Sequence, residues 1–382
     1  MPHVVVAPDK FKGSLAAPAV AGALVAGLRE GDPSLELTAL PVADGGDGTV
    51  AAAVAAGATS HRAVVAGPTG QPVAAEFAML GATAVVELAQ ASGLVRLPEG
   101  RLAPMDADSR GTGELVRAAL DLGATEVILA VGGSACTDGG TGMLTALGAR
   151  FLDGSGRPVP PGGGGLRAIA SADLTGLDPR LARTPVTLAS DVTNPLLGPD
   201  GAAAVYGPQK GAGPAQVARL DCGLRHLTTV LAASLGDVVL RQAEAPGAGA
   251  AGGVGFAALA VLGAARRPGI ELVLDLVGAD AVLARADLVI TGEGRLDAQT
   301  LSGKAPAGVL AAALRHGVPV IGVTGSCDLG PEEIRAAGLL AVHTLAGREP
   351  DLARCLAEPE PLLRAIGRDL ARSHARSGRW AT

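Results

Sequence analysis

Lysine and aromatic side chains are scarce in this chain of 382 residues. Phe, Trp and Tyr together make up 2% of it, too few for the stacking surfaces that single-stranded nucleic acids use. The 31 Lys and Arg are outnumbered by 37 Asp and Glu, and the net charge of −6 argues against nucleic-acid binding. Hydrophobic residues still make up 48%, which is enough for two domains with separate cores.

Cysteines are few and are not spaced like metal ligands or a disulfide framework. The four lie far apart, at positions 136, 222, 327 and 355, with no CxxC pair. This pattern favours reduced thiols and a cytoplasmic location, and no secretory signal is apparent at the start of the chain. The uncharged stretch 247–265 contains six glycines and is too weakly apolar to span a membrane. It predicts a glycine-rich loop that leads into a buried helix.

Short β-branched runs alternate along the chain with glycine-rich loops and Ala/Leu-rich amphipathic stretches. Strands are predicted at 4–7, 37–42, 126–131, 186–189, 287–291 and 318–324. Helices are predicted at 16–29, 113–122, 142–147, 306–315 and 332–336. Four of these helices run into a glycine suited to a left-handed C-cap: Gly123, Gly148, Gly317 and Gly338. The alternation predicts an α/β fold with parallel sheets, in which ligands bind at the carboxyl ends of the strands.

The strand–loop–helix rhythm is most regular at the two ends of the chain. The middle is richer in glycine and in long loops. This favours a discontinuous domain built from residues 1–66 plus 285–382, with a second α/β domain, residues 67–284, inserted into it.

Only four of the 31 basic residues are lysines, namely Lys10, Lys12, Lys210 and Lys304. Each lies in a loop-like segment beside Gly, Asp or Pro, where a compact and mobile ammonium group could serve a ligand. Compositional drift is the alternative. The same two interpretations apply to Asn194, the only asparagine.

Two loops near the start of the chain carry charged groups that suit a nucleotide. In the first, residues 7–14, Lys10 and Lys12 follow a strand, and Ser14 is predicted to cap a helix that begins at residue 15, an arrangement that suits an anion. In the second, residues 43–49, Asp44 and Asp47 could reach a hydrated Mg²⁺ on a nucleotide. An exposed turn and a helix-capping Asx turn are the respective alternatives.

A third loop, residues 132–142, is rich in glycine and lies between a strand and a helix. Its backbone N–H groups predict a cradle for phosphate or carboxylate around Gly133, Ser134, Thr137 and Asp138, in preference to a plain turn. The chain contains no GxxxxGK[ST] loop and no GxGxxG after its first strand.

Further polar loops point to the same chemistry. Arg110 precedes a helix and offers a guanidinium fork for an anion. Glu293 and Asp297 follow a strand and lead to Thr300, Ser302 and Lys304. No histidine lies in these loops, so we expect carboxylates and lysines to carry any acid–base chemistry.

Asp191 is the preferred candidate for a general base. It ends the run 186–190, three residues before Asn194, and Pro195 stiffens the turn that holds both. A simple Asx turn is the alternative, and Asp138 and Asp297 are rival bases.

Together these segments resemble the type I glycerate kinase family over essentially the whole chain. The resemblance is carried, in the family's order, by APDKFKGS (7–14), PVADGGDGT (41–49), SRGTGE (109–114), GGSACTDGGTGML (132–144), SDVTNPLL (190–197), VYGPQKG (205–211) and TGEGRLDAQTLSGK (291–304). Asp47 stands where the family usually has Glu, and Thr137 where it frequently has Asn.

The resemblance implies ATP-dependent phosphorylation of D-glycerate, with 2-phosphoglycerate favoured over 3-phosphoglycerate. It implies a Rossmann-like domain and a second α/β domain with the active site in the cleft between them. ATP and Mg²⁺ are the expected cofactors, and glycerate and ATP the expected partners of a monomer or homodimer that binds neither nucleic acid nor membrane.

The expected site residues form three groups. The catalytic residues are Asp191 and Lys10, and the metal ligands are Asp44, Asp47 and Asp297. Substrate and phosphates are assigned to Lys12, Ser14, Arg110, Gly133, Ser134, Thr137, Asp138, Asn194, Lys210, Glu293 and Lys304. A non-catalytic sugar-acid sensor and a nicotinamide-dependent hydroxy-acid dehydrogenase stay open as alternatives.

Overall fold

The computed structural model describes residues 1–298, 300 and 304–380, which form two compact units. The first unit comprises residues 1–44 and 51–57 and the chain from 270 onward, and the second comprises residues 45–50 and 58–269. The expected domain limits, 1–66 plus 285–382 and 67–284, and the expected cleft stay predictions.

The first unit is built on a five-stranded sheet in which every neighbouring pair is parallel. Its strands are β1 (His3–Pro8), β2 (Glu36–Ala39), β11 (Leu288–Gly292), β13 (Val320–Thr324) and β15 (Ala341–Thr344). Counted along the chain within this unit, their spatial order is 2-1-3-4-5. This is a doubly wound order, in which ligands bind where the winding reverses, here between the ends of β1 and β11.

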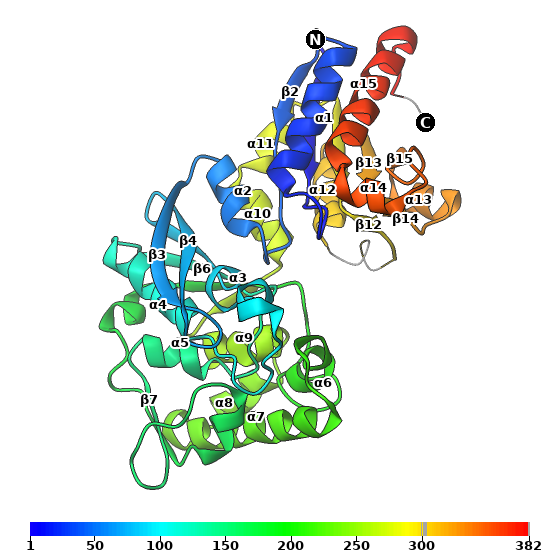
Figure 1. Cartoon of the computed structure of the whole chain (residues 1–382). Coiled ribbons are helices and arrows are strands. Elements are labelled where there is room, and N and C mark those ends of the chain that lie inside the picture. Colours follow the sequence, from blue (N-terminus) through cyan, green and yellow to red (C-terminus); the bar gives the residue numbers. More distant parts are fainter. Residues whose placement is uncertain (299, 301–303, 381–382) are drawn as a thin grey trace. The chain divides into compact units, whose positions relative to one another are not determined.

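Helices cover both faces of this sheet (Figure 1). Along β1, Val4 and Val6 pack in one core with α1 (Ala17–Gly31) and α15 (Pro359–Ser377). Val5 and Ala7 point the other way and join a core with α10 (Gly269–Leu276) and α12 (Ala305–Arg315). Because side chains alternate across a strand, an uninterrupted apolar run such as 4–7 is what a sheet covered on both faces requires.

Helices α1 and α15 approach closely because glycines line their interface. A β-carbon on Gly27 would lie 2.0 Å from the carbonyl oxygen of Arg364, and one on Gly31 would lie 2.4 Å from that of Arg368. Glu30, between them, pairs with Arg364 and Arg368 across the same contact.

We therefore predict that Gly27→Ala lowers the free energy of unfolding by about 1–3 kcal/mol, because the added methyl group overpacks the interface. Gly22→Ala in the same helix is the matched control, since a β-carbon there meets nothing within 4 Å. This control should gain up to about 1 kcal/mol from its better helix propensity. Calorimetric unfolding of both variants tests the prediction, and equal effects would contradict it.

The second unit is built on a six-stranded mixed sheet in the order β10-β9-β6-β5-β4-β3. Its strands are β3 (Thr59–Ala66), β4 (Pro72–Leu80), β5 (Thr83–Glu87), β6 (Glu126–Ala130), β9 (Val186–Ala189) and β10 (Ala265–Arg267). Strands β5, β6, β9 and β10 are parallel, and β3, β4 and β5 pair antiparallel. Strand β3 therefore runs in the direction of β5, and the β3–β4 turn lies at the edge where the parallel strands end.

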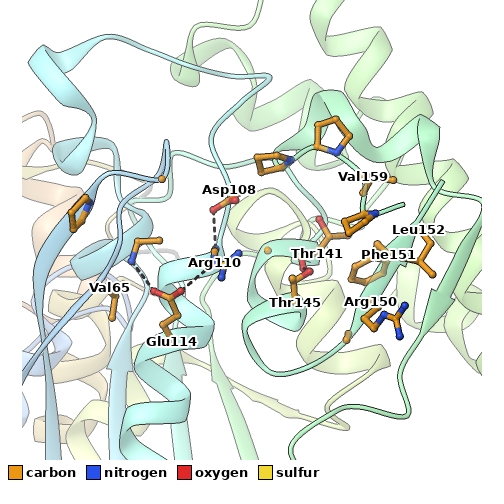
Figure 2. A pocket seen from close by; sticks show the side chains of 18 of the residues that line it. Val65, Asp108, Arg110, Glu114, Thr141, Thr145, Arg150, Phe151, Leu152 and Val159 are labelled. Carbon is orange, nitrogen blue, oxygen red and sulfur yellow. Dashed lines mark hydrogen bonds and ion pairs between the residues drawn. The ribbon is translucent and has the colours of Figure 1, made fainter. Parts of the chain in front are cut away.

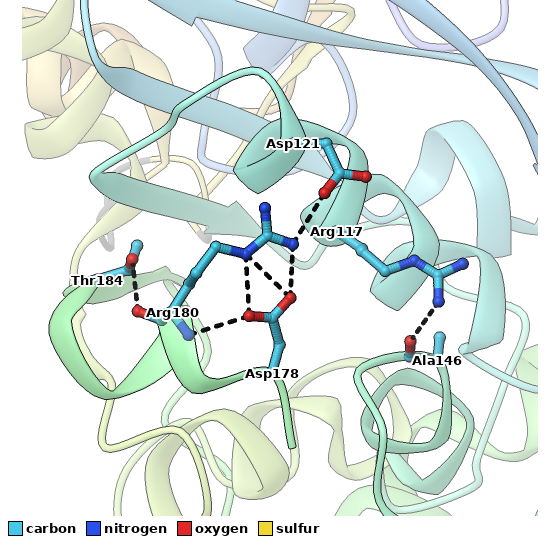
Figure 3. A network of polar contacts seen from close by, with 6 residues as sticks. All are labelled: Arg117, Asp121, Ala146, Asp178, Arg180 and Thr184. Carbon is cyan, nitrogen blue, oxygen red and sulfur yellow. Dashed lines mark hydrogen bonds and ion pairs between the residues drawn. The ribbon is translucent and has the colours of Figure 1, made fainter. Parts of the chain in front are cut away.

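The main helices of this unit are α4 (Arg110–Asp121), α5 (Thr141–Ala146), α7 (Pro214–Leu235) and α9 (Val254–Ala260). Arg110 is the first residue of α4, Asp138 lies just before α5, and an arginine network secures the far ends of both helices (Figure 3). Arg180 donates to both oxygens of Asp178 and, at 2.8 Å, to Asp121 at the end of α4. Arg117 of α4 donates to the carbonyl of Ala146 at the end of α5.

Shorter elements complete the two units. They are α2 (Thr49–Ala55), α3 (Ala89–Ser92), β7 (Arg150–Leu152), β8 (Ser171–Asp173), α6 (Ala202–Tyr206), α8 (Val238–Ala243), α11 (Ala279–Leu283), β12 (Arg295–Leu296), β14 (Ser326–Cys327), α13 (Pro331–Ala337) and α14 (Leu352–Ala357).

The prediction of an α/β fold with parallel sheets is confirmed, and the strands and helices expected from the sequence match observed elements to within a few residues. The four C-cap glycines have φ between 69° and 110°. Residues 254–260 form the buried helix expected after the glycine-rich loop. The four cysteines are free thiols. Within the described residues, no helix has the length and apolarity needed to cross a membrane.

The expectation that Ser14 caps a helix is wrong. Helix α1 begins at Ala17 after Ala16, because residues 11–15 form a tight turn closed by a bridge between Phe11 and Leu15. The Ser14 hydroxyl donates to the carbonyl of Leu356, at 2.6 Å, and so anchors this turn to α14.

Candidate active site

The structure divides the expected site residues between the two units. The first unit holds Lys10, Lys12, Ser14, Asp44, Glu293, Asp297 and Lys304, and the second holds Asp47, Arg110, Gly133, Ser134, Thr137, Asp138, Asp191, Asn194 and Lys210.

In the first unit, acids and a lysine meet where β1 and β11 end. The amide of Asp9 donates to the carbonyl of Gly292 at the end of β11. Lys10 Nζ lies 3.7 Å from Asp9 Oδ1 and 4.0 Å from Asp44 Oδ1. The lysine thus stands between two carboxylates at the point where the winding of the sheet reverses, which is the usual ligand site of such folds.

Burial raises the pKa of two acids at this edge of the sheet, Asp9 and Glu293. Asp9 is 5% exposed, and burial raises its pKa to about 7, against the pull of Lys10 and with a further push from Asp44. Burial also raises the pKa of Glu293, the residue after β11, although Thr300 and Lys304 lower it in part. Within the described residues, Glu293 Oε1 is buried without a hydrogen-bond partner. Such an atom suits a ligand that brings a donor or a cation.

The remaining expected residues of this unit surround the same edge. Asp297 accepts hydrogen bonds from the amide and hydroxyl of Thr300, which holds the turn after β12. Lys304 precedes α12, and Lys12 is exposed. Ser302 of the same motif lies outside the described residues, as do 299, 301 and 303.

We predict that Asp9→Asn changes how stability depends on pH. The folded state keeps the Asp9 proton up to about pH 7, whereas the unfolded chain releases it near pH 4. The free energy of unfolding therefore falls by up to about 4 kcal/mol as the pH rises from about 4 to 7. The Asn variant has no proton to release at this position, so its stability does not fall for this reason. The Tm of the variant should rise relative to wild type across this window and then level off. Calorimetry from pH 4 to 8 tests this, with Asp237→Asn, at an exposed position, as the control. Parallel curves for Asp9→Asn and wild type would contradict it.

In the second unit, a buried glutamate organises the loop that carries Asp47. Glu87 ends β5 and is 0% exposed, and its Oε2 accepts from the amides of Gly48 and Val50, each at 3.1 Å. Burial is the main cause that raises the pKa of Glu87, and the nearby Asp47 adds to it. Asp47 therefore lies beside a second acid at the carboxyl edge of the sheet.

Two N–H groups at the end of the glycine-rich loop 132–142, those of Gly140 and Gly142, bind the chain's own Asp138. The buried Asp138 carboxylate accepts from the amides of Gly140, Gly142 and Ser109 at 2.9–3.1 Å and from the Ser109 hydroxyl at 2.7 Å. These donors are therefore already hydrogen-bonded to a carboxylate of the chain itself. Asp138 thus links the starts of α4 and α5, and its contact with phosphate and its role as a rival base stay predictions.

Lys210 is buried at 1% exposure and is not the mobile surface lysine that the sequence suggested. Its Nζ donates to Ser134 Oγ at 2.9 Å and to the carbonyl of Cys136. Burial lowers its pKa, while Asp138 acts in the opposite direction. Through these two hydrogen bonds, Lys210 holds the glycine-rich loop in place. In the same loop the buried Thr137 hydroxyl has no hydrogen-bond partner within the described residues.

The remaining candidates of this unit lie on three loops. Asp191 Oδ1 accepts from the amide of Gly269 at 2.7 Å, which orients its carboxylate. The Asn194 side chain donates to the carbonyl of Asp200 and accepts from the hydroxyl of Tyr206, so it holds its own loop together. Arg110 pairs with Glu114 at 3.0 Å. A ligand role for each of these residues stays a prediction.

Sequence reasoning missed three acids as site residues. Asp9 and Glu87 are not singled out by the sequence, although Asp9 follows β1 and Glu87 is the last residue of β5. Asp108, just before the SRGTGE segment, is also missed. Burial, and then the neighbouring Asp138, raise the pKa of Asp108 to about 7. An acid just after a predicted strand was an available signal for Asp9, because that is the ligand edge of an α/β sheet. Strand β5 was not predicted, so Glu87 gave no such signal.

Mg²⁺ is compatible with the acids of this edge. Among the described residues, no group of three or more His, Cys, Asp or Glu is arranged to hold a metal ion. Mg²⁺ commonly takes only one or two protein carboxylates and completes its shell with water and phosphate oxygens. Asp44, beside Lys10, and Glu293, with its unpartnered buried oxygen, are suited to that use.

Comparison with known proteins identifies the family. Residues 4–375 match the sequence model of the glycerate kinase family. The chain belongs to the glycerate kinase family. It is 44% identical over 375 residues to the glycerate kinase of Bacillus subtilis (strain 168), covering 97% of each chain. It is 46% identical over 346 residues to the glycerate 2-kinase of Escherichia coli (strain K12), covering 90% of each.

A solved structure supports the same family. A protein from Salmonella typhimurium LT2, assigned as a glycerate kinase 2, superposes with a TM-score of 0.83 at 44% identity and 99% coverage of both chains. The predicted family, the fold class and the class of enzyme, a phosphotransferase, are confirmed. The family argues against the sensor and the dehydrogenase alternatives.

Proposed function

We propose that this glycerate kinase family member transfers the γ-phosphoryl group of ATP to the 2-hydroxyl of D-glycerate. Membership of the glycerate kinase family supports the reaction class, which is phosphoryl transfer from ATP to glycerate. The name of the Escherichia coli relative, a glycerate 2-kinase, supports the 2-position. One observation supports the position of the active site: Lys10 lies close to both Asp9 and Asp44 at the ends of β1 and β11.

Phosphoryl transfer depends mainly on positioning and on neutralising charge, so it needs cations and oriented carboxylates more than covalent catalysis. The bond formed joins the glycerate oxygen to Pγ, and the bond broken joins Pγ to the oxygen bridging it to ADP. Lys10 and Lys304 are the proposed cations for the charge on the phosphates. Mg²⁺, when bound with the nucleotide at Asp44 and Glu293, would neutralise further phosphate charge.

The hydroxyl proton needs an acceptor, and we assign that role to Asp191. The Gly269 amide fixes one of its oxygens, so the carboxylate keeps a constant orientation at the carboxyl edge of the second unit's sheet. Glycerate and ATP as partners, residues from both units in one active site, and a cytoplasmic location are parts of this proposal.

The experiment that tests the proposed function is ³¹P NMR of a mixture of the protein, ATP, Mg²⁺ and D-glycerate. The expected products are ADP and a phosphomonoester whose proton coupling identifies phosphate on the secondary carbon. A signal for phosphate on the primary carbon would move the reaction to the 3-hydroxyl. Unchanged ATP would overturn the proposal.

We predict that Asp191→Asn lowers kcat by about 10²–10⁴-fold, the usual contribution of general acid–base catalysis. Binding of both substrates should survive, because the side chain keeps its size and its acceptor for the Gly269 amide. Steady-state kinetics and calorimetric titration measure the two quantities. A near-normal kcat with a large rise in the KM for glycerate would instead make Asp191 a binding residue.

We also predict that Asp44→Asn raises the Mg²⁺ concentration needed for half-maximal activity by about tenfold or more, because a neutral amide is a weaker ligand for a hard cation. Asp237→Asn, which removes an exposed carboxylate elsewhere, serves as the control. If Asp44→Asn titrates with Mg²⁺ as wild type does, Asp44 is not a ligand, either directly or through water.

A further inference from the structure

A large, partly open cavity lies within the second unit, and Asp108 and Arg110 are among its lining residues. Its volume is about 710 Å³. It is bounded by the end of β3, the start of α4 and the segment 149–161 that follows α5 (Figure 2). Small-molecule sites in proteins typically measure about 300–1,000 Å³. This cavity is therefore of a size to hold a ligand much larger than a three-carbon acid.

The cavity lies at the edge where ligands bind in such folds. The end of β3 and the start of α4 are at the carboxyl edge of the parallel strands, as is the start of α5, which contributes Thr141 and Gly142. The site residues of this unit lie on loops at the same edge.

The walls are mainly apolar. Phe151, Leu152 and Val159 line one side together with prolines at 158, 160 and 161, and Val65 lines the other. Figure 2 shows Phe151, Leu152 and Val159 on one side of the cavity and Val65 on the other. The rings of Phe151 and of the prolines offer apolar surface for a ring system.

The charged groups of the wall do not suit an anion, because both arginines are already paired. Arg110 pairs with Glu114, whose second oxygen accepts from the amide of Ala66 at 2.7 Å, and Arg150 pairs with Asp173. Asp108 is the remaining acid, and its Oδ1 accepts from the amide of Arg110. Glycerate, or a triphosphate, would therefore meet two carboxylates and no unpaired cation among the described residues of the wall. An uncharged ligand with N–H or O–H donors fits better.

We infer that this cavity holds the purine nucleoside part of the phosphoryl donor. The base lies between the proline-rich segment 158–161 and the guanidinium plane of Arg110, and nucleoside donors face the carboxyl group of Asp108. The assignment rests on the proposed function, since that reaction requires a nucleoside triphosphate. It adds a location for the nucleoside, which the lysines and acids proposed for the phosphates and Mg²⁺ do not supply.

Photolabelling with 8-azido-ATP tests the assignment on the whole protein and needs no catalysis. After trypsin digestion, the label should appear on peptides 63–96, 102–110 or 151–167, which carry walls of the cavity. ATP, but not glycerate, should compete with it. A label confined to other peptides, or one that excess ATP does not reduce, would overturn the assignment.

A filled cavity gives a second test. Thr145 faces the cavity from α5, and its hydroxyl donates to the carbonyl four residues earlier. Thr145→Trp should raise the KM for ATP at least tenfold and leave the KM for glycerate within about twofold of wild type. Thr229→Trp on α7 is the matched control, because Thr229 is exposed and makes the same hydrogen bond to the carbonyl four residues earlier. An unchanged KM for ATP in a folded Thr145→Trp protein would contradict the inference. If that variant does not fold, the photolabelling decides.

The failures of the two proposals are distinguishable. A protein labelled in the cavity that does not phosphorylate glycerate keeps the nucleoside site and loses the proposed function. A protein that phosphorylates glycerate but is labelled elsewhere keeps the function and loses the nucleoside site. A protein that neither binds nor consumes ATP loses both.

Discussion

The buried carboxylate of Asp138 is the interaction on which the second unit's ligand edge depends. Four donors from two segments converge on it, so the SRGTGE segment before α4 and the glycine-rich loop before α5 are held by one charge. Hydrogen bonds from amides to an ionised acceptor are stronger than those between neutral groups, and the loss of this acceptor would leave buried N–H groups unsatisfied. Asp138 therefore fixes the starts of α4 and α5, which contribute Arg110, Thr141 and Gly142 to the cavity wall.

Internal charges brace the neighbouring loops in the same way. Glu87 binds the amides of the loop that carries Asp47, and Lys210 binds the carbonyl of Cys136 and the hydroxyl of Ser134. A buried ion is costly unless hydrogen bonds compensate it, so these groups are kept where a flexible loop must hold one geometry. The glycines of these loops then have two uses. They adopt left-handed backbone, as Gly133 and Gly140 do, and they leave room for close approach, as Gly132 does against Gly46.

The first unit follows a different principle. Its ligand edge is set by topology, because the winding of the 2-1-3-4-5 sheet reverses at the paired strands β1 and β11 and leaves a crevice outside their carboxyl ends. Asp9 and Glu293 are the residues that follow those strands. The carboxyls there are buried close to one another, which raises the pKa of both Asp9 and Glu293. Lys10 and Lys304 offset part of that cost. The carboxyl edge of this sheet thus holds both acids and lysines, which suits a ligand that combines phosphate groups with a bound cation.

The sequence by itself determined the α/β class, the positions of four of the five strands of the first unit's sheet, and the family. These follow from local features: the β-branched runs, the glycines that end helices, and motifs whose spacing is read along the chain. Only the tertiary structure decided how the polar groups are used. It showed that Asp138 binds amides at the starts of α4 and α5, that Lys210 is buried, that Ser14 anchors a turn instead of capping a helix, and that Glu87 and Asp108 belong to the ligand edge. The physical reason is that burial and pairing join residues far apart in the chain, such as Lys210 with Ser134, and the energy of a charged group depends on those partners and not on its neighbours in sequence.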